Sequence, residues 1–558
     1  MSTAFAMRAL EINAETMWRP DEVDRALRFA ADHGMNMLVF HDGDIMNRLV
    51  FPRRYFPPFS PWGAAPPRRG ENAIYNARAY LRNLTRKCRN QGIQFLLEVK
   101  ELAFPDEVLE LHPELVKNGT VCPTEPFWAE FIETRYREMC EDFVDLAGFI
   151  VSVGSPEGRA TLASKRCECE GCRNAVPADW HRTVVSAIDR AVRPFGRRLV
   201  IREFSYSKAA QDAVIESLSD LPEDIDYCVK PYARDYYMPW PDNPALPALT
   251  DRRKWVEYDV HGQYYGWGIL PCAVADDIKY RFDRARANGA SGILLRTDWE
   301  RVNGLWAVNT FSRVNLAVAA YLGLHPDADA REALTESLRT TGLVDQALDA
   351  EQTADVAAML SEVLPIVNGT MYTGRFVYNN SSTIPNGVEH AWWHMAVQND
   401  LAEWDPSAEG VLDLSRIENV EALLAEKDAA LAAWTDLLPR LRERIANGSL
   451  RLPDPGRVGD VAAWADQYLT AFAVSGIVVI LAKALEAGRR EPELPNRLER
   501  EIDALERMAR SALEREELAL YSHHIELLMG GERMLRIAED ARRILRAAQE
   551  GEAVGTRS

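Results

Sequence analysis

Up to about residue 325 the chain alternates short, β-branched apolar runs with amphipathic stretches whose apolar residues recur at helical spacing. One such stretch, DEVDRALRFAADHG, ends in a glycine that suits a left-handed helix C-cap. The rhythm predicts parallel strands joined by helical crossovers. The predicted strands are 8–13, 36–41, 93–100, 148–153, 198–204, 225–231, 255–260 and 291–297. Eight such strands predict a (β/α)8 TIM barrel over residues 1–325, in the α/β class.

From HPDADAREAL onward the pattern becomes almost wholly helical. We therefore expect an α-helical C-terminal domain over residues 326–558, whose Leu and Met stripes are typical of a bundle core or a subunit interface. A homo-oligomer formed through this domain is an expectation. In the barrel, the segment 47–70 is rich in Pro and aromatic residues and too long for a simple connector, so we expect it to build part of the binding face.

Composition narrows the classes of partner. The 558 residues are 47% hydrophobic, and Lys+Arg 65 against Asp+Glu 84 leaves a net charge of −19, which repels nucleic acid. The longest apolar run, 471–484, is too short to span a bilayer and is typical of a buried helix. The first residues lack a secretion signal pattern, so the expectation is a cytoplasmic protein with no membrane partner.

Candidate chemistry follows from the barrel, because catalytic side chains of this fold come from the carboxyl ends of the strands. The residues at these positions are rich in carboxylates, Tyr and Trp, and no Gly-rich phosphate loop accompanies them. They are His41, Asp42, Asp44, Lys100, Glu101, Glu157, Arg202, Glu203, Tyr206, Lys230, Tyr232, Asp235, His261, Gln263, Tyr264, Asp298, Trp299 and Glu300. Such a set is typical of a sugar pocket, where cleavage needs one protonated and one ionised carboxyl group.

Five segments occur in an order and spacing that resemble the barrel motifs of bacterial α-glucuronidases, glycoside hydrolase family 67. They are GFIVSVGSPEGR, VIREFSY, YCVKPYARDYY, WVEYDVHGQYYG and DWERVNGLWAVNTFSRVNLAVAAYLGLHPDADA. The resemblance covers strands four to eight and the start of the helical domain. It implies that Glu157 is the general acid, that Asp235 acts as or assists the general base, and that Arg202 and Lys230 hold the carboxylate of the substrate.

The chain departs from that family at three places. Gln263 stands where the family has a second basic carboxylate, and an amide can position water but cannot accept its proton. Val153 replaces a lysine four residues before the acid. The Trp-rich motifs of the first barrel strands are absent.

The resulting prediction is an exo-acting, inverting glycoside hydrolase for an α-linked uronic acid or related sugar in an oligosaccharide, with no catalytic cofactor. Glu157 would protonate the leaving oxygen, and Asp235 would activate a water held by Gln263. The other predicted substrate contacts are Tyr206, Tyr232, His261, Asp298 and Trp299. A retaining route, a hydrolase for an amino or neutral sugar, and a barrel that binds sugar without cleaving it remain alternatives.

Plainer interpretations also stand beside these roles. Glu157 could be a first-turn acid after Pro156, favoured by the helix dipole, and Asp235 a surface partner of Arg234. Arg202 could neutralise Glu203 or Glu157, and Lys230 could be an ordinary barrel-rim lysine. The histidine, glutamine and aromatic candidates could be buried polar groups or rim packing.

A cysteine-rich segment, CECEGC, follows the fourth strand. Cys167, Cys169 and Cys172 are close enough in sequence to bind one structural zinc ion, with Cys122 or His181 as the fourth ligand. A disulfide and free thiols are the alternatives. A metal here would brace the loop and take no part in cleavage.

Overall fold

The computed structural model describes residues 3–13, 15–50, 52, 54–55, 69–299, 305–455, 458–514 and 530–551. Eight parallel strands close into a barrel in the order β1-β10-β9-β8-β7-β6-β3-β2. The strands are β1 (Met7–Ile12), β2 (Met37–His41), β3 (Gln94–Lys100), β6 (Gly148–Ser152), β7 (Arg198–Arg202), β8 (Asp226–Val229), β9 (Lys254–Asp259) and β10 (Ala290–Arg296). The predicted TIM barrel and its eight strands are therefore confirmed.

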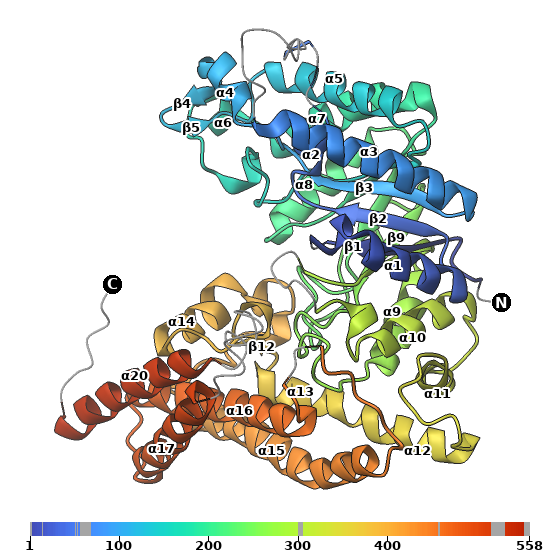
Figure 1. Cartoon of the computed structure of the whole chain (residues 1–558). Coiled ribbons are helices and arrows are strands. Elements are labelled where there is room, and N and C mark those ends of the chain that lie inside the picture. The colour runs from blue at the N-terminus through green and yellow to red at the C-terminus, as the bar shows by residue number, and fades with distance from the viewer. Residues whose placement is uncertain are drawn as a thin grey trace.

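Helices surround this barrel, as Figure 1 shows. They are α1 (Pro20–Asp32), α3 (Arg69–Asn90), α5 (Phe127–Asp142), α7 (Pro177–Val192), α8 (Lys208–Ser219), α9 (Ala275–Ala287) and α10 (Arg313–Leu324). Short elements, α2 (Ile45–Leu49), α4 (Glu107–Leu111), α6 (Glu170–Asn174) and the hairpin of β4 (Val116–Lys117) with β5 (Thr120–Val121), decorate the loops. The connection from β8 to β9 contains no helix, unlike the predicted crossover.

The barrel interior is built in layers because alternate strand residues point inward. An apolar layer fills the centre, formed by one or two residues from each strand: Met7, Ala9, Met37, Val39, Leu96, Ile150, Val200, Cys228, Trp255 and Leu294. Two residues further along each strand, the inward positions become polar: Glu11, His41, Glu98, Ser152, Arg202, Lys230, Glu257 and Arg296. The polar layer lies toward the carboxyl ends of the strands, where the candidate site begins.

The C-terminal part is helical, as predicted, and lies beside the barrel in Figure 1. Its elements are α11 (Ala330–Thr340), α12 (Ala350–Ser361), α13 (Val363–Met371), β11 (Tyr372–Thr373), β12 (Phe376–Val377), α14 (Val388–Trp393), α15 (Ile417–Ala446), α16 (Val461–Glu486), α17 (Glu493–Leu513) and α20 (Gly531–Glu550). Only α16, among the described residues, has the length and apolar composition to cross a membrane, but 89% of its most apolar window is buried inside the protein. It is the central helix of this bundle, in agreement with the buried helix predicted over 471–484.

Candidate active site

Glu157 meets a cation and a hydroxyl that come from neighbouring strands. Lys100 ends β3, and its Nζ lies 2.5 Å from Oε2 of Glu157, which follows β6. Tyr206, in the loop after β7, donates its hydroxyl proton to Oε1 of Glu157 at 2.9 Å. The predicted convergence of strand ends thus brings Lys100, from the end of β3, and Tyr206, from the loop after β7, into direct contact with Glu157.

This environment fixes the charge of Glu157. Burial alone would raise the pKa of its carboxyl group, but the Lys100 ammonium and the Tyr206 hydroxyl outweigh burial and lower the pKa to about 2. Glu157 is therefore ionised at neutral pH when no substrate is bound. The raised pKa that a general acid needs is not present in this state.

Asp235 sits in a second arrangement of the same kind. Its Oδ1 lies 2.7 Å from Nζ of Lys230, and its Oδ2 accepts a hydrogen bond from the Tyr264 hydroxyl at 2.9 Å. The Lys230 side chain is only 1% exposed, and its ammonium lies 3.6 Å from the centre of the Phe204 ring. Burial lowers the pKa of Lys230, while Asp235 opposes this by stabilising the charged form.

The two carboxylates share neighbours. The charge of Lys230 contributes to the lowered pKa of Glu157, after burial and Lys100. Burial and Glu157 raise the pKa of Tyr206, and the charge of Asp235 raises it further. Glu157 and Asp235, predicted from sequence as a pair, therefore belong to one electrostatic site around Lys230 and Tyr206.

Arg202 lies beneath this site in the polar layer of the barrel. Its Nε and Nη2 atoms donate to Oε2 and Oε1 of Glu257 at 2.5 and 2.7 Å, and Nε lies 3.0 Å from Oε1 of Glu98. The Arg202 side chain is 1% exposed. In this geometry its charge is used by two buried carboxylates, so it does not face a substrate in the way that the resemblance implies.

The other members of the polar layer complete a buried charge network. Burial raises the pKa of Glu11 to about 8 and raises the pKa of Glu98 well above its usual range. Nδ1 of His41 lies 2.7 Å from Glu11 Oε1, and burial lowers the pKa of this histidine. Glu11, His41 and Glu98 could together approach a metal ion. The guanidinium of Arg202 already supplies the positive charge there, so we assign no metal to this layer.

Gln263 connects the site to the helical region. Its Nε2 donates to Oγ of Ser381 at 3.1 Å. The hydroxyl of its neighbour Tyr264 lies 2.8 Å from Oδ1 of Asn380 as well as 2.9 Å from Oδ2 of Asp235, and these two acceptors share its single proton. Oε1 of Gln263 is buried and has no hydrogen-bond partner among the described residues. The Gln263 amide, predicted to hold water, is therefore separated from Asp235 by the side chain of Tyr264. Its Oε1 can accept a hydrogen bond from water.

Tyr232 lies elsewhere. Its side chain is buried, and its hydroxyl donates to the carboxylate of Asp277 on α9, outside the barrel strands. The guanidinium of Arg281 stacks on its ring at 4.1 Å. These contacts fit the rim-packing interpretation of Tyr232 and direct its hydroxyl away from Glu157 and Asp235.

His261, Asp298 and Trp299 lie around the ends of β9 and β10. His261 is fully buried, and its ring packs edge-to-face on Trp267 at 5.6 Å. Trp299 contacts the same Trp267 ring at 5.1 Å. Asp298 is also buried and accepts a hydrogen bond from the backbone N–H of Asn13 at 2.6 Å. All three contribute to the packing of the barrel mouth.

Two carboxylates that sequence reasoning did not select stand out in the structure. Glu257 lies within β9, and Asp259 ends it. Burial raises the pKa of Asp259 to about 6, although the backbone N–H groups of His261 and Gln263 donate to it at 3.0 and 2.8 Å. The available signal was an acid at alternate positions of an otherwise apolar strand, WVEYDV, which places both side chains inside the barrel.

The four predicted metal-ligating cysteines, Cys122, Cys167, Cys169 and Cys172, lie together outside the barrel, and their sulfur atoms are all within 4.8 Å of one another. His181, the other candidate for the fourth ligand, is not in this group; its side chain is buried near Gly154. The remaining predicted feature, the segment 47–70, lies largely outside the described residues.

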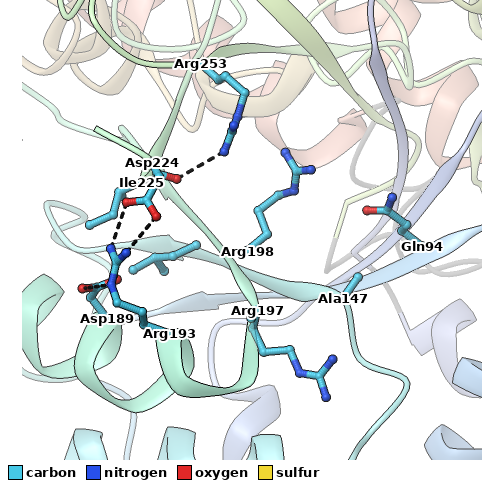
Figure 2. A pocket seen from close by; sticks show the side chains of 11 residues that line it. Gln94, Ala147, Asp189, Arg193, Arg197, Arg198, Asp224, Ile225 and Arg253 are labelled. Atoms are coloured by element: carbon cyan, nitrogen blue, oxygen red, sulfur yellow. Dashed lines mark hydrogen bonds and ion pairs between the residues drawn. The ribbon is translucent and has the colours of Figure 1, made fainter. Parts of the chain in front are cut away.

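A separate hollow of about 330 Å³ lies at the amino ends of the strands, opposite the candidate site. In Figure 2, Arg193 pairs with Asp189 and Asp224, at 2.9 and 2.8 Å. Arg198 contacts Asp226, which the figure does not draw, at 2.9 Å. Reactions on this fold occur at the carboxyl ends of the strands. The hollow therefore belongs to the structural face of the barrel.

Comparisons with known proteins bear on the fold. A solved enzyme of glycoside hydrolase family 138, which targets pectin rhamnogalacturonan II, superposes with a TM-score of 0.59 at 11% identity. The match covers 93% of this chain and 63% of that enzyme, so this chain spans less than two thirds of its length. At this identity the likeness establishes a shared fold, which is the TIM barrel with its helical extension.

Two further solved structures are less similar. The O-GlcNAc hydrolase of Thermobaculum terrenum, in a mutant form, has a TM-score of 0.43 at 10% identity, with 98% of this chain and 95% of that chain covered. The chitobiase of Flavobacterium johnsoniae has a TM-score of 0.43 at 12% identity, covering 90% and 75%. No protein family model and no curated protein sequence matches this chain. The resemblance to family 67 therefore stays a prediction.

Proposed function

We propose that this protein is a glycoside hydrolase that removes an α-linked uronic acid from the end of an oligosaccharide. The observation that carries the proposal is the pair of carboxylates, Glu157 and Asp235, each held by one lysine and one tyrosine hydroxyl at the carboxyl end of the barrel. A pair of carboxyl groups is what glycosidic cleavage requires. The enzyme that shares the fold targets a polysaccharide, which supports the same class of reaction.

The preference for an acidic sugar follows from the charge state of Glu157. With Lys100 at 2.5 Å, Glu157 is ionised and cannot donate a proton. A substrate carboxylate that pairs with Lys100 draws this cation away and adds a negative charge nearby, and both effects raise the pKa of Glu157. A neutral sugar leaves Lys100 paired with Glu157. Only a uronic acid would therefore raise the pKa of Glu157 so that it can act as the general acid.

The roles in the reaction then follow. Glu157, once protonated, donates to the leaving glycosidic oxygen, while Asp235 takes a proton from water held by the free Oε1 of Gln263. Lys230, whose Nζ lies 2.7 Å from Oδ1, holds the Asp235 carboxylate in place for this proton transfer. Attack by water on the opposite face inverts the anomeric centre, and the product's anomeric configuration, read by proton NMR within the first minutes, distinguishes this from a retaining route.

The test compares the wild type with Glu157→Gln, Asp235→Asn and a matched surface control, Glu216→Gln on the exposed face of α8. Substrates are a uronic-acid-containing disaccharide and nitrophenyl glycosides of uronic, amino and neutral sugars. We expect Glu157→Gln to lower kcat on the disaccharide by about 10²–10⁴. The loss on the nitrophenyl uronide should be smaller, because nitrophenolate leaves without protonation.

The outcomes separate the alternatives. Turnover of only the amino or neutral glycosides would identify a different sugar and would overturn the role given to Lys100. If calorimetry shows sugar binding by the wild type and by Glu157→Gln while neither turns over any substrate, the protein is a sugar-binding barrel. Glu216→Gln should match the wild type throughout.

A further inference from the structure

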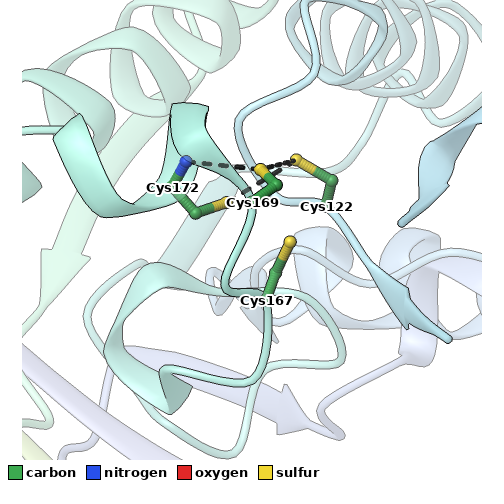
Figure 3. Close-up of side chains that lie close together, drawn as sticks. All are labelled: Cys122, Cys167, Cys169 and Cys172. Carbon is green, nitrogen blue, oxygen red and sulfur yellow. Dashed lines mark hydrogen bonds between the residues drawn. The ribbon is translucent and has the colours of Figure 1, made fainter. Parts of the chain in front are cut away.

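We propose that Cys122, Cys167, Cys169 and Cys172 bind one structural zinc ion that ties the loop after β6 to the β4–β5 hairpin. Figure 3 shows the four side chains directing their sulfur atoms toward one another from two separate segments. Sγ of Cys122 lies 3.6 Å from Sγ of both Cys169 and Cys172. All four sulfur atoms lie within 4.8 Å of one another.

These separations fit a metal better than a disulfide. Four sulfur atoms at about 2.3 Å from a tetrahedral zinc ion are about 3.8 Å apart. A disulfide bond needs about 2.05 Å between its sulfur atoms. The 3.6 Å separations within the cluster are close to the first value and far from the second, and all four thiols are free.

The surroundings support bound thiolates. The backbone N–H of Cys172 points to Sγ of Cys169 at 3.4 Å, and the hydroxyl of Thr124 lies 3.2 Å from Sγ of Cys122. Such donors stabilise the negative charge that four thiolates bring to a metal. Cys122 and Cys167 are buried and the other two are half-buried, so the cluster is shielded from bulk solvent but not fully enclosed.

The position of the four cysteines indicates what a bound metal ion would do. Cys122 follows β5, and the indole N–H groups of Trp128 and Trp180 hold its surroundings by donating to the carbonyls of Cys122 and Pro123, both at 2.8 Å. The other three cysteines follow Glu157 in the same loop. Four ligands leave no open position, so the metal braces this loop and does not act on the substrate.

The first test is the metal content of the full chain, purified without added metal or chelator. We expect about one zinc ion per chain by inductively coupled plasma mass spectrometry. Cys122→Ser and Cys169→Ser should lose it. Cys88→Ala and Cys140→Ala, which alter buried cysteines outside the cluster, should retain it.

A second measurement does not depend on the folding of the variants. Blocking the thiols of the native wild-type chain with a mercurial should release one equivalent of zinc, followed with a zinc-binding dye. Replacing the metal with cobalt(II) should give the intense absorption of tetrahedral thiolate coordination. A metal-free chain overturns the proposal. This holds if its intact mass is below that of the fully reduced chain by two hydrogens per disulfide, and equally if its mass shows that all thiols are reduced. One iron ion in place of zinc overturns the choice of metal.

Discussion

At the scale of single residues, the site repeats one arrangement twice. Glu157 contacts Lys100 and Tyr206, and Asp235 contacts Lys230 and Tyr264. In each case a cation and a phenol contact one carboxylate and fix its direction, and at Glu157 they also lower its pKa. The two carboxylates differ in exposure: the Glu157 side chain is 38% exposed and that of Asp235 is 15% exposed. Glu157 is therefore the more open to exchange of Lys100 for a substrate group.

Lys100→Met should raise the pKa of Glu157. Lys100 is the main opponent of burial there, so its removal leaves burial to raise the pKa from about 2 toward or above the ordinary value of a carboxyl group. A lowered pKa stabilises the folded chain above the unfolded value, and this contribution is lost as the pH falls toward 2. The variant should therefore lose less stability than the wild type between about pH 4.5 and pH 2.

The measurement is the free energy of unfolding as a function of pH, together with the alkaline limb of kcat/KM, which a general acid sets because it must be protonated to act. Lys279→Met, which breaks a surface ion pair with Asp283, is the control and should keep the wild-type alkaline limb. An alkaline limb that does not move in Lys100→Met would show that Lys100 does not set the charge of Glu157.

Arg202→Met tests the buried network. It leaves Glu257 and Glu98 without the guanidinium that lies 2.5 and 3.0 Å from them. Removing one partner of a buried pair costs about 3–5 kcal/mol, because the remaining charge has lost its compensation. Denaturant unfolding should show a loss of this order, and adding Glu257→Leu to Arg202→Met should recover part of it. An Arg202→Met variant as stable as the wild type would mean that the carboxylates are already neutral.

At the scale of elements, the strands were predictable and the loop contacts were not. A strand buried on both faces is a continuous apolar run bounded by turn residues, so all eight strands could be located within a few residues. The inward positions also follow from the period of two, which places Glu11, Glu98 and Glu257 in the barrel. Partners such as Asn380 and Ser381 come from loops far along the chain, and no local pattern encodes such contacts.

The same limit applies to the candidate residues. Lys230 continues the inward pleat of β8, whereas Glu157 and Tyr232 lie in loops, five and three residues beyond the ends of β6 and β8. The loop conformations direct Glu157 to Lys100 and Tyr232 to α9, and the sequence pattern encodes neither direction. The sequence could not establish that Cys122 lies near the CECEGC segment, because the two belong to separate loops and no local pattern predicts that these loops meet.

The β8–β9 connection, which carries Asp235, is held in place by hydrogen bonds to the helical region. Arg234 adopts a φ of 63°, in the left-handed region, and its Nη1 donates to Oδ1 of Asn399 at 2.5 Å. The Tyr237 hydroxyl donates to the same oxygen at 3.1 Å. Because this connection has no helix of its own, these contacts with the helical region position Asp235.

Asn399→Ala should therefore lower kcat by about tenfold or more with little change in KM, since about 1 Å of misplacement is costly to catalysis. The buried hydroxyl of Tyr237 would lose its acceptor, Arg234 would keep only the carbonyl of Gln398, and the free energy of unfolding should fall by about 1–3 kcal/mol. Asn496→Ala, on the exposed face of α17, is the control. If Asn399→Ala loses this stability but keeps the wild-type kcat, Asn399 supports the fold without positioning Asp235.

At the scale of the whole molecule, the barrel and the helical region are joined at the site itself. The indole N–H of Trp240 donates to the carbonyl of Arg375 at 3.0 Å, and the hydroxyl of Tyr372 donates to the carbonyl of Tyr264 at 3.1 Å. The boundary predicted at residue 325 follows the change from alternating to helical pattern. The pattern could not show that the second part completes the first, because it reports which faces are apolar and not what covers them.

A chain ending at residue 325 should consequently lose activity and cooperative folding. It would expose the faces of Tyr237, Trp240 and Tyr264, each at most 3% exposed in the full chain, and would leave Tyr264 without its contact to Asn380. Loss of packing with retained secondary structure predicts a normal far-UV circular dichroism spectrum, a weakened near-UV spectrum and binding of a hydrophobic dye. The full-length chain under the same conditions is the reference. A truncated chain that melts cooperatively near the Tm of the full chain and still cleaves the uronide would show that the barrel alone forms the site, because Asp235 and Tyr264 would then keep their positions without Asn380 and Asn399.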